Sequence, residues 1–306
     1  MRFNGLVTTI KLLFKFNGHD YLRDRPLEVG PMQHATPSFF RSTLLGLAAT
    51  VLVAQSGPMP PPPLIQIARE ELKPGHGGAH ANTESSWSRI MRKAKATDYY
   101  LGMSSVTGPS EAWFLMSYGS YGDYEAKQNE LDKNPAAKKE IDTISQADGE
   151  HLTGVRTILA KYRKELSYGP DVEIGKMRYF RIRTFRIKQG HWRSFEDGVK
   201  AAMAAYKKSE YPASFAFYEV TAGMGSPSYL VLRPLKSLAE LDATDAADKA
   251  FQEALGEEGQ KTMSKVFSEY VNAVENQLFS FNPKLSFVGP KTLASDPAFW
   301  TLKPAK

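Results

Sequence analysis

The chain contains no cysteine among its 306 residues. This absence excludes disulfide bonds, thiolate metal sites and a cysteine nucleophile. It also excludes the lipid-modified cysteine that anchors a lipoprotein to a membrane. A chain without thiols loses nothing in an oxidising compartment, so the composition is compatible with export.

Outside the N-terminal segment, neither sign of charge is in clear excess. The formal net charge is +6, and residues 1–56 hold six Lys or Arg against three Asp or Glu. The remaining 250 residues therefore hold 33 basic and 30 acidic residues. The sequence also lacks a zinc-finger spacing, an RNA-recognition aromatic motif and a concentrated basic helix. We therefore expect no nucleic-acid partner.

A membrane-spanning apolar run is missing as well. Leu44–Ala54 is uncharged and apolar, but it is too short to cross a bilayer comfortably. Arg41 precedes this run, and the small-x-small sequence Ala54-Gln55-Ser56 follows it. The order is typical of a secretory signal peptide, and predicts a periplasmic or secreted protein. The alternatives are an uncleaved membrane anchor through residues 43–54 and a buried helix in a cytosolic protein.

The position of this segment is unusual, because 43 residues precede Leu44. A signal peptide normally begins near the N-terminus. Met32 would supply a conventional start, so we interpret residues 1–31 as an over-extended translation start. Cleavage after the small-x-small site would leave no stable membrane span.

The remainder divides into a proline-rich segment and a globular part. Residues 57–63 include "PMPPPP", which predicts a stiff polyproline spacer outside any core. With 42% hydrophobic and 24% charged residues in the whole chain, the rest has room for two domains of ordinary size. We expect the folded part to begin at Leu64 and a C-terminal tail to occupy residues 289–306.

Three sequence segments recur in the same order at a nearly constant offset of 113 to 116 residues. The pairs are Ile65–His76 with Phe180–His191, Ser104–Met116 with Tyr218–Leu232, and Leu166–Ile174 with Phe279–Phe287. Self-similarity of this kind indicates an internal duplication. We therefore predict two tandem units, residues 64–175 and 176–288.

Each unit has the pattern strand, helix, strand, strand, helix, strand. The predicted first strands are 65–72 and 179–188, and the predicted hairpins pair 99–106 with 112–118 and 214–221 with 229–233. The first helices are expected after Asn82-Thr83 and from Trp192, the second helices at 136–166 and 257–278, and short last strands across the Ser-aromatic-x-Pro segments.

This order predicts an α+β fold. A β-α-β-β-α-β chain forms a four-stranded antiparallel sheet with both helices on one face, the ferredoxin-like arrangement. Two such sheets can pair through their open faces. We expect two tandem ferredoxin-like units that pair as an intramolecular pseudo-dimeric α+β barrel.

The two first strands end in the similar sequences "LKPGH" (Leu72–His76) and "IKQGH" (Ile187–His191). In these endings the chain resembles the dimeric α/β-barrel superfamily, which includes the antibiotic-biosynthesis monooxygenases and the NIPSNAP-type proteins. The resemblance covers about Leu64 to Val288. It implies the barrel fold and leaves the activity open, since the shared motif is short.

His191 is the candidate proton acceptor. It precedes a predicted helix, whose N-terminus disfavours an added proton, so a neutral imidazole could act as a base or orient a ligand. The alternative is that Gly190 and His191 only shape the turn, as Gly75 and His76 do in the first unit. His76 and His80 are four residues apart, but Gly77-Gly78 argues against a helix there, so we expect no metal site.

Arg181 and Arg183 lie on one face of the strand 179–188, opposite Phe180 and Ile182. If Phe180 and Ile182 pack on the helices, the two arginines point into the barrel, where a buried charge needs a partner. That partner could be Glu219, in a structural ion pair, or an anionic ligand.

Aromatic residues of the predicted hairpins complete the candidate site. Alternation separates Trp113, Leu115 and Ser117 from Phe114, Met116 and Tyr118, and the sequence does not say which set faces the interior. The candidate ligand-binding residues are His76, Trp113, Tyr118, Tyr218, Glu219 and Tyr229.

The main functional hypothesis is an exported protein that binds a small aromatic or anionic molecule in the barrel. One alternative is a cofactor-independent oxygenase or isomerase, with His191 as proton acceptor, Arg181 or Arg183 as anion stabiliser, and Tyr229 or Trp113 as lining. Another is a structural or assembly protein whose barrel is filled by side chains. We expect no cofactor, and association into a homo-oligomer stays open.

Overall fold

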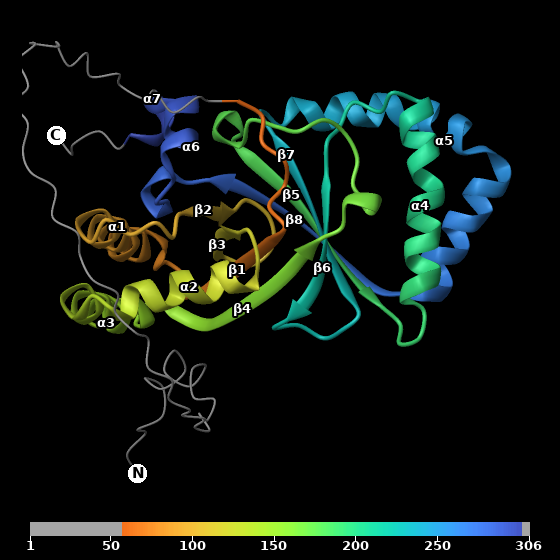
Figure 1. Cartoon of the computed structure of the whole chain (residues 1–306). Coiled ribbons are helices and arrows are strands. Elements are labelled where there is room, and N and C mark those ends of the chain that lie inside the picture. Colours follow the sequence, from red (N-terminus) through yellow and green to blue (C-terminus); the bar gives the residue numbers. More distant parts are fainter. Residues whose placement is uncertain (1–56, 302–306) are drawn as a thin grey trace, which may run out of the picture. The chain divides into compact units, whose positions relative to one another are not determined.

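A computed structural model describes residues 57–301, and these form an α+β structure (Figure 1). The first half contains β1 (Leu64–Leu72), α1 (Gly77–Lys93), β2 (Tyr100–Ser105), β3 (Glu111–Tyr118), α2 (Tyr121–Asp132), α3 (Pro135–Gly149) and β4 (Leu152–Tyr162). The second contains β5 (Tyr179–Ile187), α4 (Trp192–Lys208), β6 (Ala216–Ala222), β7 (Ser228–Leu235), α5 (Ala239–Lys265) and β8 (Val271–Phe281). Two short helices follow, α6 (Pro290–Ser295) and α7 (Pro297–Trp300).

The eight strands close into an antiparallel barrel in the order β1-β3-β2-β8-β5-β7-β6-β4. Within it, the first half supplies the run β4-β1-β3-β2 and the second half supplies β8-β5-β7-β6. The two runs have the same order and are joined by the pairs β2–β8 and β4–β6. This topology is compatible with two ferredoxin-like sheets in one chain.

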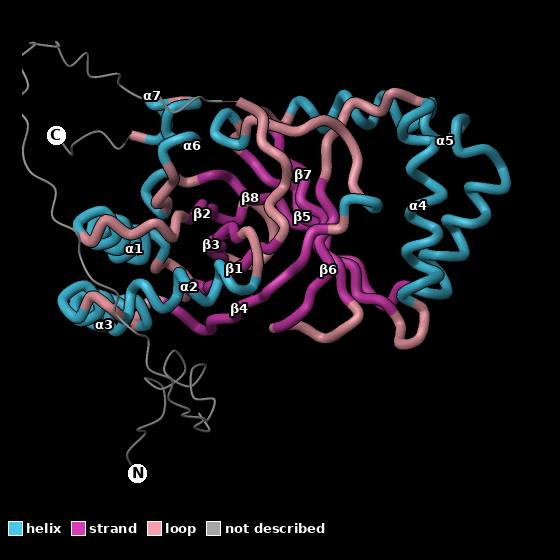
Figure 2. The backbone as a smooth tube through the Cα atoms, viewed as in Figure 1, coloured by secondary structure: helices cyan, strands magenta, loops and turns pink. Residues whose placement is uncertain are grey.

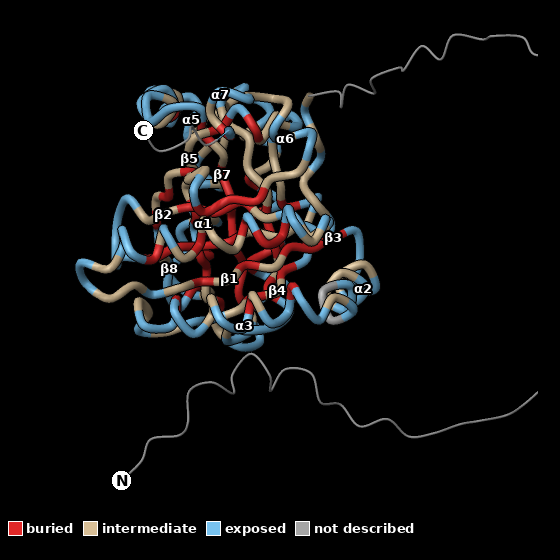
Figure 3. The backbone as a smooth tube through the Cα atoms, turned by 90° about the vertical axis from the view of Figure 1, so that its left-hand side faces the viewer, coloured by how far each residue is buried: buried red, intermediate tan, exposed pale blue. Residues whose placement is uncertain are grey.

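The helices cover the outside of the barrel, with α1, α2 and α3 on one half and α4 and α5 on the other (Figures 1 and 2). Along each strand, alternate side chains point inward and form a closely packed apolar centre that includes Ile67, Trp113, Ile182, Leu230 and Phe279. Figure 3 shows these buried strands behind the exposed outer surfaces of α1 and α3.

The last strand of the first half lies within a segment predicted as helix, and that of the second half lies mostly within one. β4 occupies residues 152–162 and β8 occupies 271–281, whereas helices were expected over 136–166 and 257–278. In β4 the buried residues Ile158 and Ala160 alternate with more exposed neighbours, which is the period of a strand. The helix predicted over 257–278 rested on a helical spacing of apolar residues that includes Val266, Val271 and Val274, but Val271 and Val274 lie on β8. Because β4 pairs with β1 and β8 pairs with β5, these segments form strands and not helices.

Two smaller boundaries also differ from expectation. α1 begins at Gly77, before Asn82-Thr83, because His76 ends the turn after β1 and occupies the N-cap position. The first Ser-aromatic-x-Pro segment, where a last strand was expected, follows β4. The second begins in the last residues of β8 and continues into a short 3₁₀ turn at Pro283–Leu285.

The proline segment (Pro58–Pro63), expected as a free spacer, packs against the barrel. Met59 pairs with Val172 in an isolated β-bridge, and the Tyr218 hydroxyl donates to the Pro62 carbonyl at 3.2 Å. The C-terminal tail also docks, because Trp300 is buried and its Nε1–H donates to the Gly175 carbonyl at 2.8 Å.

Among residues 57–301, none of the helices combines the length and apolar character needed to cross a bilayer. The predicted signal peptide and the alternative anchor fall in residues 1–56, outside the described part of the chain.

Candidate functional site

A cavity of about 870 Å³ lies at the end of the barrel where β1 and β5 begin. Its floor includes Ile65, Leu101, Phe180 and Leu232, which also belong to the apolar centre of the barrel. The proline segment contributes to its wall. A volume of this size accommodates a drug-sized molecule.

Tyrosines are the most distinctive residues of this wall. The cavity is lined by Tyr99, Tyr100, Tyr162, Tyr168 and Tyr218. The rings of Tyr162 and Tyr218 lie 5.5 Å apart, centroid to centroid. Burial raises the pKa of the Tyr218 phenol, and the neighbouring Tyr162 raises it further, so this hydroxyl stays protonated at neutral pH.

Cations outnumber anions around the opening. The lining holds four lysines, Lys127, Lys164, Lys207 and Lys291, and one acidic residue, Asp171. Lys127 is 3.7 Å from Asp123. In the described part of the chain, the other three lysines are exposed and form no ion pair.

The opposite end of the barrel interior is closed by a buried polar cluster. The Arg69 guanidinium donates to Glu111 at 3.0 Å, and the Trp113 indole N–H donates to the same carboxylate at 2.6 Å. Gln277 donates to it at 3.4 Å. These groups bond to one another and form a buried polar plug, in which, within residues 57–301, only the Gln277 side-chain oxygen lacks a hydrogen-bond partner.

Tyr218 alone, among the six predicted ligand-binding residues, lines the cavity. Trp113 faces the interior, as one of the two alternatives had it, but it is fully buried in the plug beside Arg69. Tyr118 faces the helices, where its hydroxyl lies 3.2 Å from Asp98 and from Gln66.

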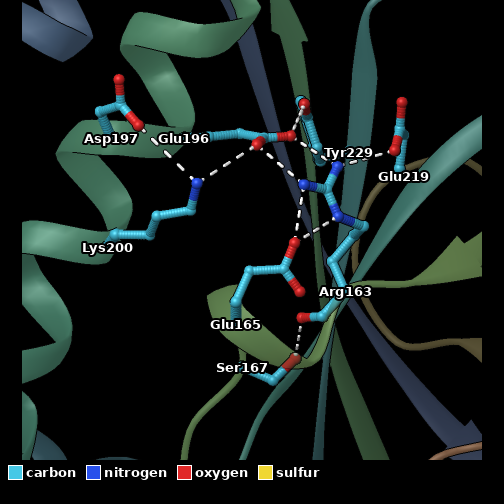
Figure 4. Close-up of polar contacts among 8 residues, drawn as sticks. All are labelled: Arg163, Glu165, Ser167, Glu196, Asp197, Lys200, Glu219 and Tyr229. Atoms are coloured by element: carbon cyan, nitrogen blue, oxygen red, sulfur yellow. Dashed lines mark hydrogen bonds and ion pairs between the residues drawn. The ribbon is translucent and has the colours of Figure 1, made fainter.

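Glu219 and Tyr229 belong to a network around Arg163, on the outer face of the second half (Figure 4). The Arg163 guanidinium donates to Glu196 at 2.5 and 2.8 Å and to Glu219 at 2.7 Å. The Tyr229 hydroxyl donates to Glu196 at 2.6 Å. The predicted partner of Glu219, an arginine of β5, is therefore replaced by Arg163.

Arg181 and Arg183 point outward, toward the helices. Phe180 and Ile182 occupy the barrel centre, so the condition that would have directed the arginines inward is not met. Arg181 pairs with Arg233 across β5 and β7, and Arg233 bonds to Thr244 and Glu240 of α5. The two arginines thus lie away from the cavity.

The two predicted histidines are at the corners of the fold. His191 is exposed at the N-cap of α4, and its ring stacks on Tyr270 with centroids 4.9 Å apart. His76 occupies the same place before α1, with its Nδ1 3.1 Å from Nδ1 of His151. Neither lines the cavity.

The sequence contained a signal for part of the lining that was not used. Tyr162 ends β4, and Lys164 and Tyr168 follow it. Tyr162 and Lys164 were interpreted as the end of a helix, and Tyr168 as part of a short last strand. Once residues 152–162 are recognised as an alternating strand, this aromatic and basic segment falls at a barrel mouth, where ligands are often bound.

One group of side chains within residues 57–301 could hold a metal ion, and it lies outside the cavity. It comprises Glu70, His80, Glu84 and Asp148. Burial raises the pKa of Glu84, and the charges of Glu70 and Asp148 raise it further. No metal site was expected from the sequence, although His80 and Glu84 have the i, i+4 spacing that places two ligands on one helix face.

Comparison with known proteins finds only distant similarities, all of them to solved structures. No protein-family model and no curated protein matches the chain. A monooxygenase-like protein from Fusobacterium nucleatum is 9% identical, over 73% of this chain and 94% of that chain, with a TM-score of 0.48. An anthrone oxidase-like protein is 12% identical, over 72% and 91%, with a TM-score of 0.49.

The chlorite dismutase of Candidatus Nitrospira defluvii is 8% identical, over 72% of this chain and 91% of that chain, with a TM-score of 0.42. Since all three TM-scores are below 0.5, these similarities carry no conclusion about activity. The assignment of the fold rests on the strand order.

Proposed function

We propose that the protein binds a small aromatic molecule that carries a negative charge, in the cavity at the mouth of the barrel. The observation that carries this proposal is the cavity itself, about 870 Å³ in volume and walled by tyrosines and aliphatic side chains. Such a wall favours a flat apolar ligand, since aromatic faces pack on one another with an added gain of about 1 kcal/mol per pair.

The charge of the ligand is inferred from the opening. As far as residues 57–301 are concerned, Lys164, Lys207 and Lys291 are exposed there without an ion pair, and Asp171 is the one acidic residue of the lining. An anionic group at the opening would meet a positive potential and keep its contact with water. The apolar part of the same ligand would lie deeper, near Tyr218.

A pair of fluorescent probes tests both parts of the proposal. The sulfonate 1-anilinonaphthalene-8-sulfonate and the uncharged N-phenyl-1-naphthylamine share an aromatic body and differ in charge. We expect both to bind, with the sulfonate bound more tightly. Ala216→Trp should abolish binding, because Ala216 lines the cavity and an indole there occupies the space of the ligand.

The controls separate the cavity from the remaining surface. Ala250→Trp, on the exposed side of α5, should bind both probes as the unmodified protein does. Lys164→Gln combined with Lys207→Gln should weaken binding of the sulfonate by up to about fivefold and leave binding of the neutral probe unchanged. Equal binding by Ala216→Trp and Ala250→Trp would exclude the cavity as the site.

The catalytic alternative receives no support from the arrangement of its residues. His191, Arg181 and Arg183 lie outside the cavity, and Trp113 and Tyr229 are engaged by Glu111 and Glu196. The structural alternative fits the packed centre of the barrel, and it leaves the cavity at the mouth without a role.

The domain organisation and export complete the proposal. Tandem duplication is supported by the equal strand order of the two halves and by α1 and α4, which are both 17 residues long and begin 115 residues apart. A strand-for-strand superposition of Leu64–Ile174 on Tyr179–Phe287 is the check. Export is supported by the apolar run and small-x-small site of residues 44–56.

A further inference from the structure

Four ionisable side chains meet outside the barrel, between β1, α1 and α3. Glu70 lies on the outer face of β1, His80 and Glu84 lie one turn apart on α1, and Asp148 is at the end of α3. One ligand atom from each lies within 4.8 Å of the others. His80 Nε2 is 2.8 Å from a Glu70 oxygen and 3.8 Å from an Asp148 oxygen.

Three of the four side chains are buried, that of Glu70 is 15% exposed, and none has a lysine or arginine partner within residues 57–301. His80 is 1% exposed, Asp148 4% and Glu84 5%. In the described part of the chain, the contacts of Glu70 and Asp148 are with His80 and Thr83. Three carboxylates held together away from water cost several kcal/mol unless protons or a cation neutralise them.

Glu84 supplies an independent indication of a ligand. Its carboxylate forms no hydrogen bond or ion pair within residues 57–301, although the residue is 95% buried and one of its oxygens belongs to the group. Within residues 57–301, the buried hydroxyl oxygen of Tyr100 also has no hydrogen-bond partner. Burial raises the pKa of this phenol, and the charge of Glu84 raises it further. Buried polar groups without partners are rare in folded proteins and point to a missing ion or water.

The other half of the barrel shows that the fold does not require polar residues here. With the offset of 115, Glu70, His80 and Glu84 correspond to Phe185, Phe195 and Val199. These three residues pack together with Val266, from the helix that precedes β8, in an apolar cluster. The same place is therefore filled by hydrocarbon in one half and by acids and an imidazole in the other.

We propose that Glu70, His80, Glu84 and Asp148 bind a divalent first-row transition-metal ion. An imidazole nitrogen with carboxylate oxygens suits Zn²⁺, Fe²⁺ or Mn²⁺, whereas Ca²⁺ takes six to eight oxygen ligands. Ligands around such an ion lie up to about 4.4 Å apart, twice the metal–ligand distance of about 2.2 Å. A separation of at most 4.8 Å therefore needs only a small adjustment of side chains.

The competing explanation is an internal ion pair. In it, His80 carries a proton between Glu70 and Asp148, and Glu84 is a neutral acid. That arrangement balances the charge without a metal, and it predicts that the protein binds Zn²⁺ and Mn²⁺ no better than its surface does.

Metal counting on the full chain decides between the two. The protein is stripped with EDTA and dialysed against ZnCl₂, MnCl₂ or CaCl₂ at equal concentration, and the bound metal is measured by plasma mass spectrometry. We expect one equivalent of Zn²⁺ or Mn²⁺ per chain. Glu84→Gln, which keeps the volume of the side chain, should weaken binding by at least about tenfold.

Two control variants retain the site. Glu253→Gln removes an exposed acid of α5, and His191→Ala removes an exposed histidine, so both should bind metal as the unmodified protein does. Asp148→Asn provides a second ligand variant if Glu84→Gln misfolds, as judged by circular dichroism. Absence of stoichiometric Zn²⁺ and Mn²⁺, equal binding by Glu84→Gln, or equal binding of Ca²⁺ would overturn the proposal.

Discussion

Arg163 is the centre of a charged network that joins three glutamates (Figure 4). Its guanidinium bonds to Glu165, Glu196 and Glu219, which come from a turn, from α4 and from β6. Burial raises the pKa of Glu196, but the hydrogen bonds from Arg163 and Tyr229 outweigh it and hold that pKa below its usual range. The network thereby ties α4 to the barrel wall.

Glu196→Gln should lower the free energy of unfolding by about 1–3 kcal/mol at pH 7, because Arg163 loses its buried carboxylate partner. The difference depends on pH. A carboxyl group with a lowered folded pKa contributes stability above its unfolded pKa of about 4.3, and this contribution is lost as the pH falls through the folded value. The difference in free energy of unfolding between the unmodified protein and Glu196→Gln should therefore become smaller near pH 3.

Urea unfolding at pH 7 and pH 3 measures this difference, with Glu253→Gln as the exposed-acid control. A difference that stays constant with pH would mean that the charge of Glu196 is not what Arg163 stabilises.

At the scale of elements, the proline segment is the part whose role differs most from expectation. Residues 59–62 line the cavity and are held by the β-bridge of Met59 and by the hydrogen bond from Tyr218 to Pro62. Proline restricts the backbone before a ligand arrives, so little ordering entropy is lost on binding.

Replacement of Pro60, Pro61 and Pro62 by glycine should raise the Kd of the sulfonate probe about fivefold. The reason is that about 1 kcal/mol of ordering entropy would then be lost on binding. Fluorescence titration measures the Kd, and Pro74→Gly, in the exposed turn after β1, is the matched control. An unchanged Kd in the triple variant would show that the segment does not help to form the site.

At the scale of the whole molecule, export determines which part of the chain is the mature protein. If the small-x-small site is cleaved, N-terminal sequencing of the protein recovered outside the cytoplasm should begin at Gln55 or Gly57. A sequence that begins at Met1 or Met32 would favour the anchor or the cytosolic alternative. The cleaved chain would retain the proline segment and all eight strands.

Local patterns were sufficient to predict that each half has a first strand, a first helix and a hairpin, although α1 begins at Gly77 and not after Asn82-Thr83. Alternation in 65–72 and 179–187, the apolar stripe after Trp192 and the glycine-rich turns are properties of neighbouring residues, and the structure confirms the α+β class that follows from them. The last strands were missed because their apolar spacing also fits a helix, and only pairing with β1 and β5 separates the two.

The sequence by itself determined the first strand, first helix and hairpin of each half and the alternation of strand faces, because these depend on residues close together in the chain. Closure of the barrel decided the rest. It placed Phe180 and Ile182 inside, and it placed Arg181 and Arg183, which alternate with them, outside. It brought Tyr218 and the proline segment to one mouth, and it gathered Glu70, His80 and Asp148 from three elements. Such contacts join distant segments, so they depend on which faces pack together and not on local spacing.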